Sequence, residues 1–135
     1  MFRVSKSVSF CYGHRLINYQ GKCRHLHGHN ARAVITLESA VLDGRGMVED
    51  FSDLKRLVWD WLDQEIDHTM LLHKDDPVLP LLRDAGERVR TLNENPTAEA
   101  IARMIYDYVA GKGYPVSEVT VWETETSRAS YSRES

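Results

Sequence analysis

The chain has 135 residues, 42% of them hydrophobic and 27% charged, with a formal net charge of −3 at pH 7. This composition is that of an ordinary globular protein and excludes an intrinsically disordered or collagen-like chain, and the apolar runs are too short for a membrane span. The negative net charge argues against nucleic acid as a partner, because affinity for the phosphate backbone comes mainly from clustered Lys and Arg.

The length and the N-terminus give two further expectations. Residues 1–135 are expected to form a single domain around one core. The first residues lack the apolar stretch and the cleavage site of a signal peptide, so we expect a cytoplasmic protein. Cys11 and Cys23 are the only cysteines and form no CxxC motif, which indicates neither a disulfide framework nor a Cys-rich metal site.

Two segments near the N-terminus alternate between two kinds of side chain. In residues 2–14 the even positions are mostly apolar or aromatic, and residues 27–38 repeat this alternation. A period of two predicts β-strands, and these two strands are expected to pair in antiparallel orientation. The odd positions of the first strand form a serine row, which consists of Ser5, Ser7 and Ser9.

A turn and an amphipathic helix are predicted next. Residues 43–46 contain an aspartate and two glycines and mark the turn, and residues 47–49 are expected to add a short strand. Ser52 is expected to cap the helix that follows. From Leu54 onward the apolar residues recur every three or four positions, which predicts a helix that covers a sheet and ends near Asp67.

The second half of the chain is predicted to contain a loop, a helix and a hairpin. Residues 73–95 show no sustained period and are expected to be a long loop with one short helical turn. Pro96 is expected at the first helical position, and the apolar stripe after it predicts a helix that stops at Gly111. Residues 119–123 share a strand pattern, and residues 128–133 are expected to return as its hairpin partner.

This order of elements predicts the fold class. Strand, strand, helix, helix, strand, strand is typical of an α+β fold, here an antiparallel four-stranded sheet with two helices on one face. The serine row would lie on the opposite face. Such a polar face can meet solvent or line the wet interior of an oligomeric barrel.

Three histidines are the strongest chemical signal. His27 and His29 lie two residues apart on a strand, so both imidazoles can reach one metal ion. Antiparallel pairing brings His14, at the end of the first strand, to the same end of the sheet. Three imidazoles without a thiolate are typical of catalytic zinc with an open fourth position, although iron, nickel and copper accept the same ligands. The alternatives are separate hydrogen-bonded histidines, or His25 as a ligand in place of a neighbour.

Three further residues are candidates for proton transfer. Cys23 is flanked by two cationic residues, which favour a thiolate that acts as base or nucleophile, and a buried inert thiol is the alternative. Asp67 and His68 are adjacent and form a possible carboxylate–imidazole pair. Solvation of the helix end is the alternative for this pair.

Glu123 is a candidate for ligand binding. It continues the apolar face of residues 119–121, so its carboxylate is expected where apolar side chains belong. A buried carboxylate needs a partner, and the edge of a guanidine-like ligand would supply one.

Several motifs occur in a fixed order along the chain. They are Phe10-x-x-x-His14, Cys23-Arg-His-Leu-His27-Gly28-His29, Gly46-Met-Val-Glu-Asp50-Phe51-x-x-Leu54-Lys55, Asp67-His68, Asn95-Pro96-Thr97-x-Glu99 and Trp122-Glu123-Thr124. Each motif is weak alone, but the combination is highly specific. Over nearly its whole length the chain resembles the family of 6-pyruvoyltetrahydropterin synthase and 6-carboxytetrahydropterin synthase.

The resemblance implies an architecture and a set of site residues. Three subunits would close their sheets into the barrel of a tunnelling fold, with the serine row facing the lumen, and two trimers would stack into a homohexamer with active sites between subunits. The implied ligands of Zn²⁺ are His14, His27 and His29. The implied proton-transfer residues are Cys23, Asp67 and His68. The implied pterin-binding residues are Glu123 and, at the helix start, Thr97 and Glu99, for which ordinary capping is the alternative.

The resemblance also implies a lyase acting on 7,8-dihydroneopterin triphosphate. The gap between Cys23 and His27 is similar to that of the carboxy branch, which cleaves the side chain and feeds 7-deazapurine (queuosine) synthesis. Two features depart from that branch: the loop between Leu72 and Asn95 is longer, and Ser127 stands where a cysteine is frequent. A 6-pyruvoyltetrahydropterin synthase and a non-catalytic metal-binding module on the same fold are the alternatives.

Overall fold

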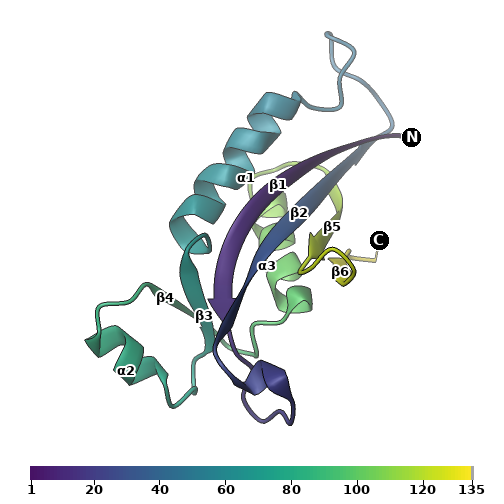
Figure 1. The fold of residues 1–135 in the computed structure, drawn as a ribbon. Coiled ribbons are helices and arrows are strands. Elements are labelled where there is room, and N and C mark those ends of the chain that lie inside the picture. The colour runs from purple at the N-terminus through teal and green to yellow at the C-terminus, as the bar shows by residue number, and fades with distance from the viewer. Residues whose placement is uncertain (135) are drawn as a thin grey trace.

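The computed structural model describes residues 1–134, which form one six-stranded sheet with helices packed against it (Figure 1). Along the chain the elements are β1 (Phe2–His14), the 3₁₀ turn η1 (Lys22–Arg24), β2 (His27–Ser39), α1 (Phe51–Glu65), β3 (Thr69–His73), α2 (Leu79–Asp84), β4 (Val89–Leu92), α3 (Ala98–Gly111), β5 (Val116–Trp122) and β6 (Arg128–Tyr131). The strand order in the sheet is β4-β3-β1-β2-β5-β6.

The long β1–β2 hairpin is the centre of the sheet. Its antiparallel register runs from Phe2 opposite Ser39 to His14 opposite His27, as the alternation predicted. The even positions from Val8 to His14 in β1 and the odd positions from Ala31 to Leu37 in β2 are buried, because the side chains of paired residues lie on the same face of the sheet. The two predicted N-terminal strands are therefore confirmed, to within one residue at each end.

Helices α1 and α3 cover one face of the sheet (Figure 1). Their apolar stripes pack onto the buried strand positions, with Leu54, Val58 and Leu62 from α1 among the fully buried side chains. The two predicted helices are confirmed, but their first residues differ. Asp50 caps α1, because its side chain accepts a hydrogen bond from the Ser52 amide at 2.7 Å, so the expectation of a Ser52 cap is wrong.

The start of α3 also differs from the expectation. Thr97 is the N-cap and Ala98 the first helical residue, so Pro96 precedes the helix instead of opening it. Residues 47–49 form no strand, because a turn closes there. The Met47 amide donates to the Asp43 carboxylate, and the Asp43 amide donates to the Met47 carbonyl.

The predicted antiparallel four-stranded sheet is wrong in strand number and in direction. The sheet is mixed, since β3 pairs in parallel with both β1 and β4, whereas β1–β2, β2–β5 and β5–β6 are antiparallel. The segment predicted as a long loop contains β4 and the short helix α2, and β3 fills the gap after α1. The predicted helical turn and the β6 hairpin partner are confirmed. The fold class, α+β, is confirmed as well.

The face opposite α1 and α3 is polar. Its serine row is exposed, and hydroxyls pair across strands, for example Ser5 with Thr36 at 2.9 Å and Thr120 with Ser130 at 2.7 Å. We call it the open face, because the two long helices pack on the other side. Among residues 1–134, no helix has the length and apolar character needed to cross a membrane.

Candidate metal centre and proton-transfer site

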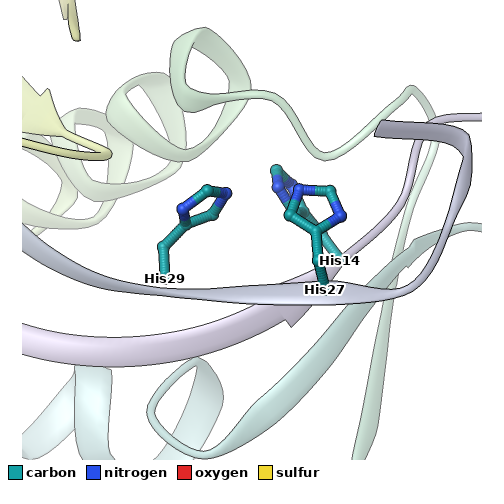
Figure 2. A group of neighbouring side chains, drawn as sticks. All are labelled: His14, His27 and His29. Atoms are coloured by element: carbon teal, nitrogen blue, oxygen red, sulfur yellow. The ribbon is translucent and has the colours of Figure 1, made fainter. Parts of the chain in front are cut away.

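The three predicted histidines come together at one end of the sheet. His14 ends β1 and pairs with His27 at the start of β2, and His29 follows on the same, helix-covered face. The ring centroids are 4.5 Å apart for His14 and His27, 5.1 Å for His14 and His29, and 5.0 Å for His27 and His29. One ring nitrogen of each lies within 4.8 Å of the others, and Figure 2 shows the rings gathered above β2.

In two of the three rings, hydrogen bonds decide which nitrogen is free. His14 Nδ1 donates to the carbonyl of Pro96 at 2.6 Å, and His27 Nδ1 donates to the carbonyl of His25 at 2.7 Å. A carbonyl only accepts, so Nδ1 carries the proton and Nε2 keeps its lone pair for a metal.

Two of these nitrogens are buried without a partner. Neither Nε2 of His14 nor Nε2 of His29 forms a hydrogen bond with any of the described residues. Buried polar atoms are nearly always paired, since an unpaired one costs free energy. A divalent metal ion would satisfy both atoms, so this donor set fits the predicted metal.

The electrostatics of the cluster favour neutral rings. Burial lowers the pKa of His14, although its bond to Pro96 works in the opposite direction. Burial likewise lowers the pKa of His29, against the effect of the Glu123 carboxylate. Neutral imidazole is the form that binds metal.

Glu123 borders the histidine cluster, directly after β5. Its Oε1 lies 3.6 Å from Nε2 of His14 and 3.6 Å from Nε2 of His29. The Tyr12 hydroxyl donates to the same oxygen at 3.1 Å, which gives this carboxylate a partner. Burial, and then the Glu123 charge, raises the pKa of Tyr12 well above its ordinary value, so the phenol remains a donor. Tyr12 was not a predicted site residue, although the alternation of β1 places it on the histidine face.

The chain just before α3 supports the cluster. The Asn95 side chain accepts from the Ile17 amide at 3.0 Å and donates to the Ile17 carbonyl at 2.9 Å. The next residue, Pro96, supplies the carbonyl that orients His14. The sequence interpretation treated Pro96 only as a helix signal and missed this role.

Asp67 and His68 form the predicted carboxylate–imidazole pair. Asp67 Oδ2 lies 2.7 Å from His68 Nδ1, and its other oxygen accepts from the Cys11 amide at 2.8 Å. Burial works to raise the pKa of Asp67, but the hydrogen bonds from Cys11 and His68 outweigh it and hold that pKa below its ordinary value. The His68 side chain is 76% exposed, so its ring can exchange protons with a ligand or with solvent.

The thiol beside this pair is Cys11, whose Sγ lies 3.5 Å from His68 Nδ1. Cys23 lies in η1, half-buried, and its carbonyl accepts a hydrogen bond from the Leu16 amide. Within one chain, Cys23 is therefore not part of the group formed by Cys11, Asp67 and His68. The sequence offered no signal for Cys11, because its neighbourhood depends on contacts with residues 67 and 68.

The remaining candidates occupy ordinary positions. His25 is exposed, its ring accepts from Arg24 Nε at 3.2 Å, and it lies outside the histidine cluster. The Thr97 hydroxyl caps α3 by accepting a hydrogen bond from the Ala100 amide at 3.1 Å. Capping is the role that the sequence analysis gave as the alternative to pterin binding. Glu99 is exposed in the first turn of α3, where a carboxylate favours the helix dipole.

A cavity of about 640 Å³ at this end of the sheet has residues of both groups in its lining, among them His27, His29, Cys11 and His68. Its size is within the range of small-molecule binding sites. The histidine cluster and the group that contains Cys11 and His68 thus border one space.

Comparisons with known proteins show which family this chain resembles along its length and which fold it shares. The family model for 6-pyruvoyl tetrahydropterin synthase matches residues 3–134. The 6-carboxy-5,6,7,8-tetrahydropterin synthase of Rickettsia felis is 32% identical over 131 residues, which cover 92% of this chain and 95% of that protein. The protein of the same name from Rickettsia bellii is 38% identical over 104 residues, covering 76% and 75%. The structure of Caenorhabditis elegans 6-pyruvoyl tetrahydropterin synthase has the same fold, with a TM-score of 0.72, 23% identity and coverage of 98% and 96%.

Proposed function

The chain belongs to the 6-pyruvoyl tetrahydropterin synthase family, and on this premise we propose that it is a zinc-dependent lyase that converts 7,8-dihydroneopterin triphosphate to 6-carboxy-5,6,7,8-tetrahydropterin. The observation that carries the proposal is the histidine cluster with two buried, unpartnered Nε2 atoms. The names of the relatives that are more than 30% identical support the carboxy product over the pyruvoyl product. The reaction serves 7-deazapurine synthesis in the cytoplasm.

The metal would be held by His14, His27 and His29. When bound, zinc supplies Lewis-acid chemistry and a template for the side-chain hydroxyls of the substrate. Pro96 and the His25 carbonyl keep the ring protons of His14 and His27 away from the metal side. Glu123, oriented by Tyr12, binds the amino-pyrimidine edge of the pterin, and Thr97 and Glu99 assist from the start of α3.

Proton transfer falls to Cys23, Asp67 and His68. The Cys23 thiolate removes a proton from the substrate side chain as triphosphate leaves, and the Asp67–His68 pair passes protons on. Because Cys23 lies apart from this pair in one chain, the proposal places each active site between subunits of a homohexamer built from two trimers. The exposed His68 ring supports a site completed by a neighbouring copy.

The test is turnover of the proposed substrate. Purified, zinc-loaded protein is incubated with 7,8-dihydroneopterin triphosphate, with metal-stripped protein as the control. The expected products, identified by mass spectrometry, are triphosphate, acetaldehyde and 6-carboxytetrahydropterin. Triphosphate without acetaldehyde would instead assign a 6-pyruvoyltetrahydropterin synthase. If zinc-loaded protein released no triphosphate, the proposal would be overturned, and a non-catalytic metal-binding module would be the remaining alternative.

A further inference from the structure

The open face of the sheet carries two arginines against one tryptophan. Trp122 on β5 is the register partner of both Arg32 on β2 and Arg128 on β6, so the three side chains form a row across three strands. The guanidinium carbons of Arg32 and Arg128 lie 5.3 Å and 4.9 Å from the centroid of the Trp122 ring. These are cation–π distances, so the indole holds two cations in place.

Neither of these arginines forms an ion pair with the described residues. Among residues 1–134, no carboxylate oxygen lies within 4.0 Å of either guanidinium, whereas Arg3 on the same face pairs with Glu38 at 2.9 Å. Because the two guanidinium carbons lie 5.3 Å and 4.9 Å from one centroid, they are at most about 10 Å apart, close to the screening length of about 8 Å at physiological salt. Their mutual repulsion would fall if an anion bound to both.

A cavity lies at the Arg32 end of this row. It has a volume of about 600 Å³, and Arg32 and Trp122 line it together with Ser9, Asn30, Thr124 and His68 and with the carboxylates of Asp67 and Glu125, whereas Arg128 lies outside this lining. Hydroxyl and amide groups donate hydrogen bonds to phosphate oxygens, and guanidinium groups add charge-assisted ones. An anion in this cavity would therefore lie beside the proton-transfer pair.

We propose that Arg32 and Arg128, held by Trp122, form an oligophosphate-binding site that takes the phosphate chain of the substrate and holds the released triphosphate. A chain of several phosphate groups can contact both guanidiniums at once, whereas a single phosphate group is less able to span them. The identity of the substrate rests on the proposed function, but the anion chemistry rests on the arginines alone. The histidine cluster of the same chain lies on the opposite face of the sheet. In the site between subunits that is proposed above, the pterin of that substrate would contact the metal centre of a neighbouring copy.

The experiment measures binding of inorganic tripolyphosphate and of inorganic phosphate to the zinc-loaded protein by isothermal titration calorimetry. Tripolyphosphate is expected to bind more tightly than phosphate, and more weakly as salt rises. Arg32→Gln and Arg128→Gln are each expected to weaken tripolyphosphate binding about tenfold or more, because each loses charge-assisted hydrogen bonds. Arg3→Gln, which removes a paired charge from the same face, is the matched control and is expected to bind as wild type.

Three results would overturn the proposal: equal affinity of all three variants, tripolyphosphate bound no more tightly than phosphate, or binding lost in His27→Ala but kept in Arg32→Gln. The last result would assign the anion to the metal centre. Arginine-dependent binding by a protein that does not turn over the pterin triphosphate would keep this site and reject only the proposed reaction. In an active protein, Arg32→Gln is expected to raise KM about tenfold with a smaller change in kcat.

Discussion

Two histidine-containing groups lie at the same end of the sheet, and they differ in every property that decides their chemistry. The cluster of His14, His27 and His29 faces the helix-covered side, and its buried Nε2 atoms have no protein partner. His68 is exposed and already hydrogen-bonded to a carboxylate. Unpaired lone pairs in a buried cluster indicate metal binding, whereas an exposed, carboxylate-oriented ring is suited to moving protons.

Removing one ring from the first group should have the largest effect. His27→Ala is expected to lose zinc and to lower turnover at least about 10³-fold, because several kcal/mol of Lewis-acid stabilisation disappear. Zinc is measured by elemental analysis after gel filtration. The control is His25→Ala, which keeps the backbone carbonyl that orients His27 and should keep its zinc. Full zinc content in His27→Ala would instead assign the ligand role to His25.

The two thiols test whether proton transfer is separate from metal binding. Cys23→Ala is expected to lower kcat by about 10² to 10⁴ with zinc retained, which is the usual contribution of a general base. Cys11→Ala serves as the comparison and should lose less, because Cys11 only contacts the Asp67–His68 pair. The outcome is read from steady-state rates and zinc content of both variants. A larger loss in Cys11→Ala would make Cys11 the base and the prediction for Cys23 wrong.

The chain directly after His14 gives a prediction on stability. Arg15 donates two hydrogen bonds to the fully buried Asp76 side chain, from Nε to Oδ2 at 2.8 Å and from Nη2 to Oδ1. Burial works to raise the pKa of Asp76, but the bonds from Arg15 and the Val78 amide outweigh it and lower that pKa. Because the folded pKa is lower than the unfolded value of about 3.9, the pair stabilises the fold above that pH and ceases to do so as pH falls through the folded pKa.

Arg15→Gln is therefore expected to destabilise the protein by about 1 to 3 kcal/mol at neutral pH, since a buried carboxylate loses its partner. The difference from wild type should shrink toward zero in acid. This difference in unfolding free energy is measured by urea unfolding at neutral pH and at acid pH, with protein and zinc concentrations held fixed. Arg56→Gln, which removes an exposed partner of Asp53, is the control and should cost less than about 0.5 kcal/mol. An equal loss at neutral and acid pH would contradict the assignment.

The smallest effect is expected at Thr97, beside the carbonyl that orients His14. Thr97→Ala should cost about 1 kcal/mol through loss of the α3 cap, and Thr97→Ser should restore it. Zinc content should stay at the wild-type value, whereas KM should rise in Thr97→Ala because Thr97 is proposed to assist pterin binding. An unchanged KM beside the loss of urea stability would leave Thr97 as a helix cap alone and contradict its proposed binding role.

The histidine cluster could be anticipated because the strand alternation carries its geometry. A side-chain period of two places His27 and His29 on one face of β2, and the register of the β1–β2 hairpin sets His14 opposite His27. The helices were predictable for the same reason, since each repeats its apolar residues at helical spacing. The sequence interpretation missed β3 and β4, which have only five and four residues and pair in parallel with partners distant along the chain.

The pair of Asp67 and His68 shows which contacts sequence patterns do not predict. Adjacent residues need not touch, and here His68 has a φ of 55° and its Nδ1 lies 2.7 Å from the Asp67 carboxylate. The contact between Cys11 and His68 arises because α1 returns the chain to the edge of β1. No local pattern in the sequence encodes that return.

Local periodicity thus specified which face each strand and helix residue occupies, because those positions follow from backbone geometry alone. The chain order could not specify which distant segments meet: Cys11 with Asp67, His14 with Pro96, and Trp122 with Arg32. Those contacts depend on how α1 and α3 pack on the sheet and on how the strands are ordered within it. The cluster of metal-fitting histidines is accordingly a property of one hairpin, whereas the partners of each functional group are a property of the assembled fold.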